Sequence, residues 1–302
     1  MQLKPRVLSN ELGILKCLNT RIDLSAKDKK HYLKLEKGYQ GEVMFDQLTA
    51  KIPCDMYVLN DLCLEFNHSV FQIDTLIISE KTIFSVEIKN YEGDYIYDAE
   101  EFRRVLSDYE IINPLTQLKR SNLLLRSLLK NLKIYLPIEG YIIFVNPAFT
   151  LYQAPSNTSF IFPTQINRFI KTLNETPSNL RSQHNRLAEL LISMHQTESP
   201  YTQLPSYEYH QLRKGITCAA CHSFKNTVGE KKLECNQCGT VEDVDSAVLR
   251  NIEEFRLLFP DKKITTNCIH EWCRSISSKK KIRRILSQNL KPIGAREHRY
   301  FV

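Results

Sequence analysis

The 302-residue sequence contains no apolar run that approaches the roughly 20 residues needed to cross a lipid bilayer as a helix. Its first residues, MQLKPR, also lack the apolar core of a signal peptide. These two absences argue against a protein that spans a membrane or is exported. We therefore expect a cytoplasmic protein with no membrane partner.

A disulfide framework is not expected either, although the sequence contains nine cysteines. The number is odd and the chain has no export signal, which argues against paired, oxidised cysteines. Five of them stand singly and are expected to be small, buried or partly buried side chains. These five are Cys17, Cys54, Cys63, Cys268 and Cys273.

The composition is that of an ordinary globular protein, with 42% hydrophobic and 25% charged residues. The length is sufficient for two or three domains. A formal net charge of +7 permits a nucleic-acid partner without requiring one.

Two short apolar-rich runs, Phe71–Ile78 and Thr82–Lys89, are separated by three polar residues. Both runs are rich in β-branched and aromatic residues and are too short for ordinary helices, which predicts a β-hairpin. Alternation along the strands assigns one face to Phe71, Ile73, Thr75 and Ile77, with Phe84, Val86 and Ile88. We expect that face to pack on a core, while the other presents Asp74, Glu87 and Lys89.

Those three polar residues suggest a metal site. Two carboxylates on neighbouring strands suit a hard cation such as Mg²⁺, and a nearby lysine can stabilise charge that develops on a phosphate. The alternative is an exposed Glu/Lys pair on a solvated sheet face, which is the commoner meaning of an isolated E-x-K. Asp74 on the paired strand shifts the balance toward the metal site.

Several separated motifs resemble the nuclease-related domain, NERD, of the PD-(D/E)XK nuclease superfamily. They are GYQGE at 38–42, QID at 72–74 and EIKNYEG at 87–93. The resemblance covers about residues 35–147. It implies an α/β fold like that of restriction endonucleases, with a mixed sheet flanked by helices. It also implies hydrolysis of phosphodiester bonds with Mg²⁺ or Mn²⁺.

The resemblance also implies roles for individual residues. Asp74 and Glu87 would bind the Mg²⁺ ion, and Lys89 would assist the attacking water. Glu42, on the preceding helix, would support the metal or its water. Ile73 replaces the proline of the superfamily name, at a position that varies among members.

A helix is predicted from Pro114 to about Leu132, with Asn113 as its N-terminal cap. Gln117 on this helix is similar to a glutamine of related nucleases that positions the substrate or the active-site lysine. The alternative is an exposed polar residue in a first helical turn. The two interpretations are about equally supported.

Three more helices and one more strand are predicted in and around this region. A helix is expected from Ser25 to about Ala50, and the resemblance suggests that it restarts near Gly38. The continuous apolar run Gly140–Asn146 predicts a strand buried on both faces. Helices over Phe160–Leu173 and Asn179–Met194 are expected to pack on the core.

Two cysteine pairs, Cys218-x2-Cys221 and Cys235-x2-Cys238, are separated by thirteen residues. Each pair lets a tight turn direct two thiolates at one ion, and four thiolates complete a tetrahedron around Zn²⁺. Because no coordination position stays open, the zinc would be structural. The pattern resembles a zinc ribbon, a module that contacts DNA, RNA or proteins.

The C-terminal region shows three helical stretches, Asp245–Leu258, Thr265–Arg274 and Ser277–Asn289, then a closing strand near 299–302. This order is that of a winged helix-turn-helix. The last helix carries five basic residues that we assign as candidate nucleic-acid contacts: Lys279, Lys280, Lys281, Arg283 and Arg284. The alternative is a small helical bundle with a basic, solvated face.

The expected domain order therefore begins with an N-terminal helical segment and ends with a nucleic-acid-binding tail. The parts are 1–34 (helical segment), 35–150 (nuclease-like domain), 151–197 (helical extension), 198–212 (linker), 213–242 (zinc ribbon) and 243–302 (tail).

The function predicted from these patterns is metal-dependent hydrolysis of DNA in processing, repair or defence. DNA is the expected partner, and RNA is the alternative nucleic acid. Two other classes stay open: a non-catalytic nucleic-acid-binding module, and a scaffold that binds a protein partner through the zinc ribbon.

Overall fold

The structure is a computed structural model that describes residues 1–53, 55–98, 101–106, 110–156, 159–197, 202–295 and 298–302. Cys54 and part of the expected linker, residues 198–201, lie outside the described residues. The chain forms two compact units. The first unit comprises Met1–Leu8 and Lys34–Tyr201, and the second comprises Ser9–Leu33 and Thr202–Val302. The segment 1–34 is thus divided between the two units.

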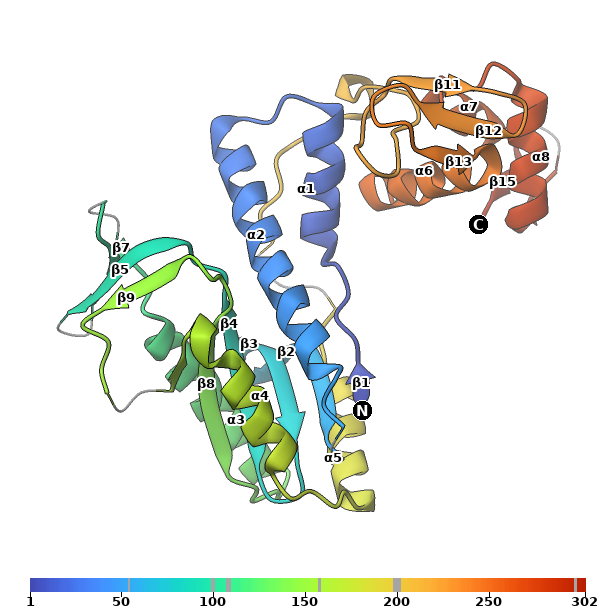
Figure 1. Cartoon of the computed structure of the whole chain (residues 1–302). Helices are drawn as coiled ribbons and strands as arrows, with labels where there is room; N and C mark the ends of the chain where they lie inside the picture. Colours follow the sequence, from blue (N-terminus) through green and yellow to red (C-terminus); the bar gives the residue numbers. More distant parts are fainter. Residues whose placement is uncertain (54, 99–100, 107–109, 157–158, 198–201, 296–297) are drawn as a thin grey trace. The chain divides into compact units, whose positions relative to one another are not determined.

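A six-stranded mixed sheet forms the centre of the first unit, in the order β1-β2-β3-β4-β8-β10 (Figure 1). Strands β2, β3 and β4 are antiparallel, whereas β1 pairs in parallel with β2, and β8 pairs in parallel with β4 and β10. The expected mixed α/β architecture is confirmed. The strands are β1 (Gln2–Lys4), β2 (Tyr57–Phe66), β3 (Ser69–Ile78), β4 (Ile83–Lys89), β8 (Ile138–Phe144) and β10 (Phe160–Ile161).

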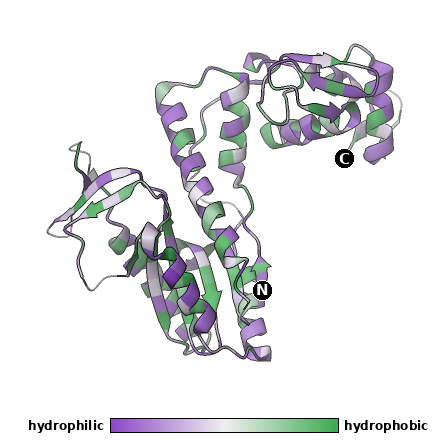
Figure 2. Ribbon diagram, viewed as in Figure 1, coloured by the Kyte–Doolittle hydropathy of each residue, from purple (hydrophilic) through white to green (hydrophobic). Residues whose placement is uncertain are grey.

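Helices cover both faces of this sheet. Helices α3 (Pro114–Asn131) and α5 (Ser182–Ser193) contribute leucines to one apolar core, and α2 (Ala26–Thr49) and α4 (Ile166–Glu175) contribute phenylalanines to the other. In Figure 2 the sheet strands are largely hydrophobic, while α2 is mixed along its length. Every residue of β4 except Lys89 is buried. The alternative interpretation, an exposed Glu/Lys pair on a solvated sheet face, does not fit, because helices cover both sides.

The predicted face assignment on the first run of the hairpin is also wrong. Phe71 and Ile73 pack in the core with α3 and α5, whereas Ile77 packs in the core with α2 and α4. Leu76 and Ile78 pack in the same core as Phe71 and Ile73, so the side-chain faces of β3 change between Ile73 and Leu76. Strand β2 also departs from simple alternation, because Leu59 and Leu62 share that core on either side of Asp61, whose φ is 53°.

Helix α2 runs unbroken through Gly38 and Gly41, so the predicted restart near Gly38 is wrong. At Gly41 a Cβ atom would lie 2.6 Å from the Cβ of Asn90 and 3.0 Å from a methyl of Val145. The glycine allows close packing of the helix rather than a break. The predicted helix over 160–173 is also corrected at its start, because Phe160–Ile161 extends the sheet and a 3₁₀ turn, η1 (Pro163–Gln165), precedes α4.

A smaller four-stranded sheet, β7-β6-β5-β9, completes the first unit. It packs against the central sheet through aromatic rings. The rings of Phe144 on β8 and Phe149 on β9 are stacked, with centroids 4.1 Å apart. Its strands are β5 (Gly93–Asp98), β6 (Glu101–Arg104), β7 (Glu110–Ile111) and β9 (Phe149–Tyr152).

The second unit joins an N-terminal helix to the C-terminal third of the chain. Helix α1 (Asn10–Arg21) contributes Ile14 and Leu18 to the same core as Phe255 and the single tryptophan, Trp272. The buried Arg21 binds Glu254 at 2.7 Å and lies 4.0 Å from the ring centre of Trp272. Sequence alone did not indicate this long-range association of α1.

The remaining elements of the second unit follow in chain order. They are η2 (Tyr209–Gln211), the antiparallel sheet β11 (Asn226–Val228), β12 (Lys232–Cys235) and β13 (Val241–Asp243), helices α6 (Val244–Leu258), α7 (Thr266–Trp272) and α8 (Lys279–Asn289), and the pair β14 (Pro292–Ile293) and β15 (Tyr300–Phe301). Among the described residues, no helix has both the length and the apolar character needed to span a membrane.

Candidate functional site

The predicted carboxylates lie where the β3–β4 pairing ends. The ladder extends from Ile78↔Ile83 to Thr75↔Val86, and Asp74 and Glu87 follow this last pair on the two strands. Beyond that point an Asp74 carboxylate oxygen accepts the backbone N–H of Ile88 at 2.7 Å. Asp74 is 8% exposed and Glu87 is 2% exposed. The two carboxylates are therefore fixed by the sheet and largely removed from solvent.

Lys89 and Gln117 both contact Glu87. The Lys89 ammonium donates to Oε1 of Glu87 at 2.7 Å and to the amide oxygen of Gln117 at 3.0 Å. The Gln117 amide N–H donates to the same Glu87 oxygen. Gln117 reaches this site because it lies on the first turns of α3, which packs against the sheet. The structure thus brings these three predicted residues into direct contact.

Glu42 is linked to the site through Arg6. One Arg6 nitrogen donates to Glu42 at 2.8 Å, and a two-pronged contact at 2.9 and 3.1 Å binds Asp46. Arg6 also donates to the backbone carbonyl of Asp74 at 2.7 Å. Its side chain is only 3% exposed, so it is a buried connector between α2 and β3.

Arg6 and Asp46 are site residues that the sequence patterns missed. Asp46 follows Glu42 by one helical turn, and this i,i+4 spacing is a signal that could have identified it. Arg6 gives no comparable signal, because its partners lie 36 to 69 residues away in the chain. Only the folded chain brings it to the carboxylates.

The carboxyl groups of the site ionise less readily than usual. Burial, with the Asp74 charge nearby, raises the pKa of Glu87 to about 7 against the opposing effect of Lys89. Burial and the Asp74 charge likewise raise the pKa of Glu42 to about 8, although Arg6 opposes them. Burial also raises the pKa of Asp74. The site therefore concentrates negative charge that its own cations only partly balance.

Lys89 stays protonated in this setting. Burial is the largest single effect and would lower the pKa of Lys89, but the combined effects of Glu87, Tyr91 and Asp74 raise the pKa overall. An ammonium group at this position can donate a hydrogen bond and stabilise negative charge, but it cannot accept a proton. The geometry therefore favours an electrostatic role for Lys89 over that of a general base.

The donor set at the hairpin fits a hard divalent cation. Asp74 and Glu87 offer carboxylate oxygens, and Mg²⁺ is commonly held by one or two carboxylates with several waters. A divalent charge would also favour the ionised form of these two carboxyl groups, whose pKa values burial raises. Within the described residues, three or more metal-binding groups within 4.8 Å of one another are found only at the cysteine cluster. The hairpin site is thus a partial ligand set rather than a closed protein cage.

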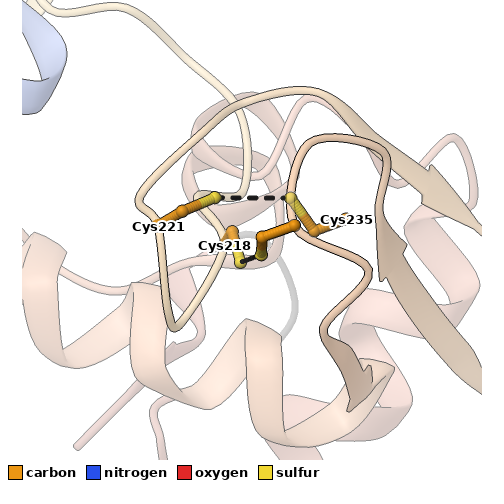
Figure 3. A group of neighbouring side chains, drawn as sticks. Cys218, Cys221 and Cys235 are labelled. Carbon is orange, nitrogen blue, oxygen red and sulfur yellow. Dashed lines mark hydrogen bonds between the residues drawn. The ribbon is translucent and has the colours of Figure 1, made fainter.

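The four paired cysteines converge in the second unit, and Figure 3 labels three of them, Cys218, Cys221 and Cys235. Their sulfur atoms all lie within 4.8 Å of one another, with Cys218 and Cys238 3.6 Å apart and Cys221 and Cys235 3.5 Å apart. Cys218 and Cys235 are 1% exposed. Four sulfur ligands at this spacing could hold a structural Zn²⁺ ion.

The two cysteine turns share one backbone design. In each, the amide two residues after the first cysteine points at that sulfur at 3.4 Å: Ala220 to Cys218, and Gln237 to Cys235. The residue after the second cysteine has a positive φ, 58° at His222 and 72° at Gly239. Hydrogen bonds from Thr240 hold the pKa of Cys238 down to about 6, which favours the thiolate that a metal requires.

The four single cysteines that the structure describes are free. Cys63 and Cys273 are buried, and Cys17 and Cys268 are partly buried, in agreement with the expected burial.

The five basic residues assigned to the last helix all lie on or at the start of α8 but do not share one environment. Lys281 donates to the carbonyl of Glu230, and Arg284 binds Asp245 at 2.7 Å. Lys279, Lys280 and Arg283 are exposed and line a common hollow.

Comparison with known proteins finds a family match within the first unit. Residues 37–145 match the model of the nuclease-related domain, NERD. A stretch of 85 residues is 38% identical to an uncharacterized protein of Bacillus anthracis, covering 28% of this chain and 39% of that relative. No solved structure matches the chain significantly. A nuclease-related domain is therefore present at 37–145, a range that contains all five residues predicted for the hairpin site.

Proposed function

We propose that the first unit is a metal-dependent nuclease that hydrolyses phosphodiester bonds in DNA, and that it belongs to the PD-(D/E)XK superfamily. The observation that carries this proposal is the contact of Lys89 and Gln117 with Glu87, beside the buried Asp74. The match to a nuclease-related domain supports it. An exposed Glu/Lys pair, the alternative from sequence, does not account for carboxylates held at 8% and 2% exposure.

In this proposal Asp74 and Glu87 hold Mg²⁺ or Mn²⁺. The bound ion would supply Lewis acidity and lower the pKa of a bound water. Lys89, as an ammonium, would stabilise the charge that develops on the phosphate in the transition state. Gln117 would fix the orientation of Lys89, because it bonds both to the ammonium and to Glu87.

Glu42 and Arg6 would control the charge balance of the same site. Glu42 would orient a water near the metal, and Arg6 would restrain Glu42 through the 2.8 Å contact. Arg6 also fixes the β3 backbone at Asp74 through its carbonyl. These two residues would thus act through position and charge, with Arg6 as a positioning residue.

The second unit would bind nucleic acid. Four cysteines around Zn²⁺ and the antiparallel sheet β11-β12-β13 support a zinc ribbon. The order α6, α7, α8, β14, β15, with a bridge between Ile264 and Phe301, supports a winged helix-turn-helix. A protein partner on the ribbon is the alternative, and salt-sensitive binding to DNA distinguishes the two.

The test is a cleavage assay on linear, circular, single-stranded and forked DNA and on RNA, with Mg²⁺ or Mn²⁺. Lys89→Ala and EDTA should each abolish cleavage. Lys81→Ala is the matched control, because Lys81 is an exposed lysine in the turn of the same hairpin and should leave cleavage unchanged. Absence of cleavage on every substrate, with DNA binding retained, would support a non-catalytic binding module instead.

A further inference from the structure

The outer surface of α8 borders a hollow of about 660 Å³ within the second unit. Its walls come from the start of α7, from α8 and from the C-terminal strand; Figure 1 shows α8 and β15 in this unit. The lining residues are Thr265, Thr266, Asn267, Lys279, Lys280, Arg283, Arg299 and Phe301. Four of these eight side chains are cationic and none is acidic, among the described residues that line the hollow.

Among the described residues, nothing balances the positive charge of Lys279, Lys280 and Arg283. No ion pair with a described residue is formed by Lys279, Lys280 or Arg283, whose side chains are exposed. The first turn of α8 contains no acidic residue. Lysines at a helix N-terminus are unfavourable, because the positive end of the helix dipole lies there. An anion in the hollow would relieve both sources of repulsion.

Arg299 provides an independent indication of a ligand. Its Nε atom is buried and has no hydrogen-bond partner in the described structure. A buried donor without a partner is uncommon and often marks a missing ion, water or ligand. Because the guanidinium borders the hollow, a phosphate oxygen there could satisfy it with a charge-assisted hydrogen bond.

The other two basic residues of α8 serve the fold instead. Arg284 is bound to Asp245 of α6 and to Gln288, and Lys281 is bound to the carbonyl of Glu230. These contacts tie α8 to the rest of the second unit. The five basic residues assigned from sequence therefore divide into three that are available to a ligand and two that are already engaged.

We propose that Lys279, Lys280, Arg283 and Arg299 form a phosphate-binding site for the sugar-phosphate backbone of duplex DNA. This inference extends the proposed nucleic-acid binding of the second unit. The size and the exposed rim of the hollow suit a passing polyanionic strand, and its polar walls at Thr266 and Asn267 offer further hydrogen bonds to phosphate.

The test compares two double variants that remove the same charge from the same helix. Lys279→Ala/Arg283→Ala removes two cations of the hollow, and Lys281→Ala/Arg284→Ala removes the two engaged ones. Binding of a fluorescent DNA duplex, and of an RNA duplex of matching sequence, is measured by anisotropy over a series of salt concentrations. Both variants also carry Lys89→Ala, so that cleavage does not affect the result.

The hollow variant should bind about tenfold more weakly, and its slope of log K against log salt should be shallower by about 2, one for each phosphate contact. The matched variant should keep the parental slope. Equal losses in both variants, no loss in either, or a loss seen only with duplex RNA would overturn the assignment.

This outcome is separable from the nuclease proposal. If Lys89→Ala leaves cleavage intact but the hollow variant loses binding, the phosphate site stands and the proposed catalytic site falls. If cleavage depends on Lys89 while both double variants bind alike, the proposed catalytic site stands and the phosphate site falls.

Discussion

At the hairpin site, the balance between carboxylates and cations determines how the substitution of a single residue changes stability. Three carboxyl groups with raised pKa values lie near two cations, the buried Arg6 side chain and the partly buried Lys89. Removing a cation leaves buried anions without partners, and removing an anion relieves repulsion. Substitutions of either sign therefore have predictable and opposite consequences for stability.

Glu87 should make the metal-free protein less stable as pH rises. Its pKa is raised from an ordinary 4.5 to about 7, so the folded state retains a proton that the unfolded state releases in this window. Stability is then highest at the acidic end and declines as pH rises toward about 7. Glu87→Gln should flatten this decline in urea unfolding of EDTA-treated protein.

The control is Glu101→Gln, an exposed carboxylate on β6, which should keep the parental pH profile. An unchanged profile in Glu87→Gln would show that the proton is held elsewhere. Added Mg²⁺ should reverse the trend, because metal binding favours the ionised carboxylate.

Arg6→Gln should destabilise the protein by about 3–5 kcal/mol, because Glu42 and Asp46 would lose their buried counter-charge. Arg6→Lys keeps the charge but cannot form the two-pronged contact, so an intermediate loss is expected. Chemical denaturation measures both. A loss under about 1 kcal/mol in Arg6→Gln would mean that the contact behaves as an exposed ion pair.

At the scale of whole elements, the backbone conformation at a glycine determines how a substitution there changes stability. Gly239 closes the second cysteine turn with a φ of 72°, and Gly38 lies inside α2. A Cβ atom at either position would meet nothing within 4 Å. The same substitution at the two sites therefore isolates the conformational effect from any steric clash.

Gly239→Ala should destabilise the second unit by about 1–2 kcal/mol, because a side chain disfavours the left-handed region. Gly38→Ala should stabilise the protein by up to about 1 kcal/mol, because alanine favours a helix interior. Thermal unfolding of the two variants measures both effects. Shifts of the same sign would contradict this explanation.

The whole molecule consists of two units with separate cores, and a single tryptophan reports on one of them. Trp272 is fully buried in the second unit, beside Phe255. Cys235→Ser should abolish zinc binding and lower the unfolding midpoint seen by tryptophan fluorescence. The part of the circular dichroism transition that reports the first unit should remain.

Cys268→Ser is the matched control, because Cys268 is a partly buried free cysteine of the same unit. It should retain one zinc per chain by elemental analysis and change the midpoint little. Zinc retained in Cys235→Ser, or lost in Cys268→Ser, would refute the four-cysteine site.

The sequence by itself determined the local parts of this protein. The hairpin, the capped helix after Asn113, the buried strand near Gly140–Asn146 and the four-cysteine cluster are each encoded by short patterns. Their signals act over a few residues: alternation of apolar side chains, a cap, a proline and paired cysteines. The structure accordingly reproduces these elements, with shifts of a few residues at their ends.

Tertiary structure alone decided which distant residues meet. Arg6 joins the carboxylates, α1 joins the core around Trp272, and the side-chain faces of β3 change between Ile73 and Leu76. It also divided the basic residues of α8 into those that face a hollow and those bound to the fold. Such contacts depend on packing and charge between residues that are far apart in the chain. A local sequence pattern therefore cannot predict them.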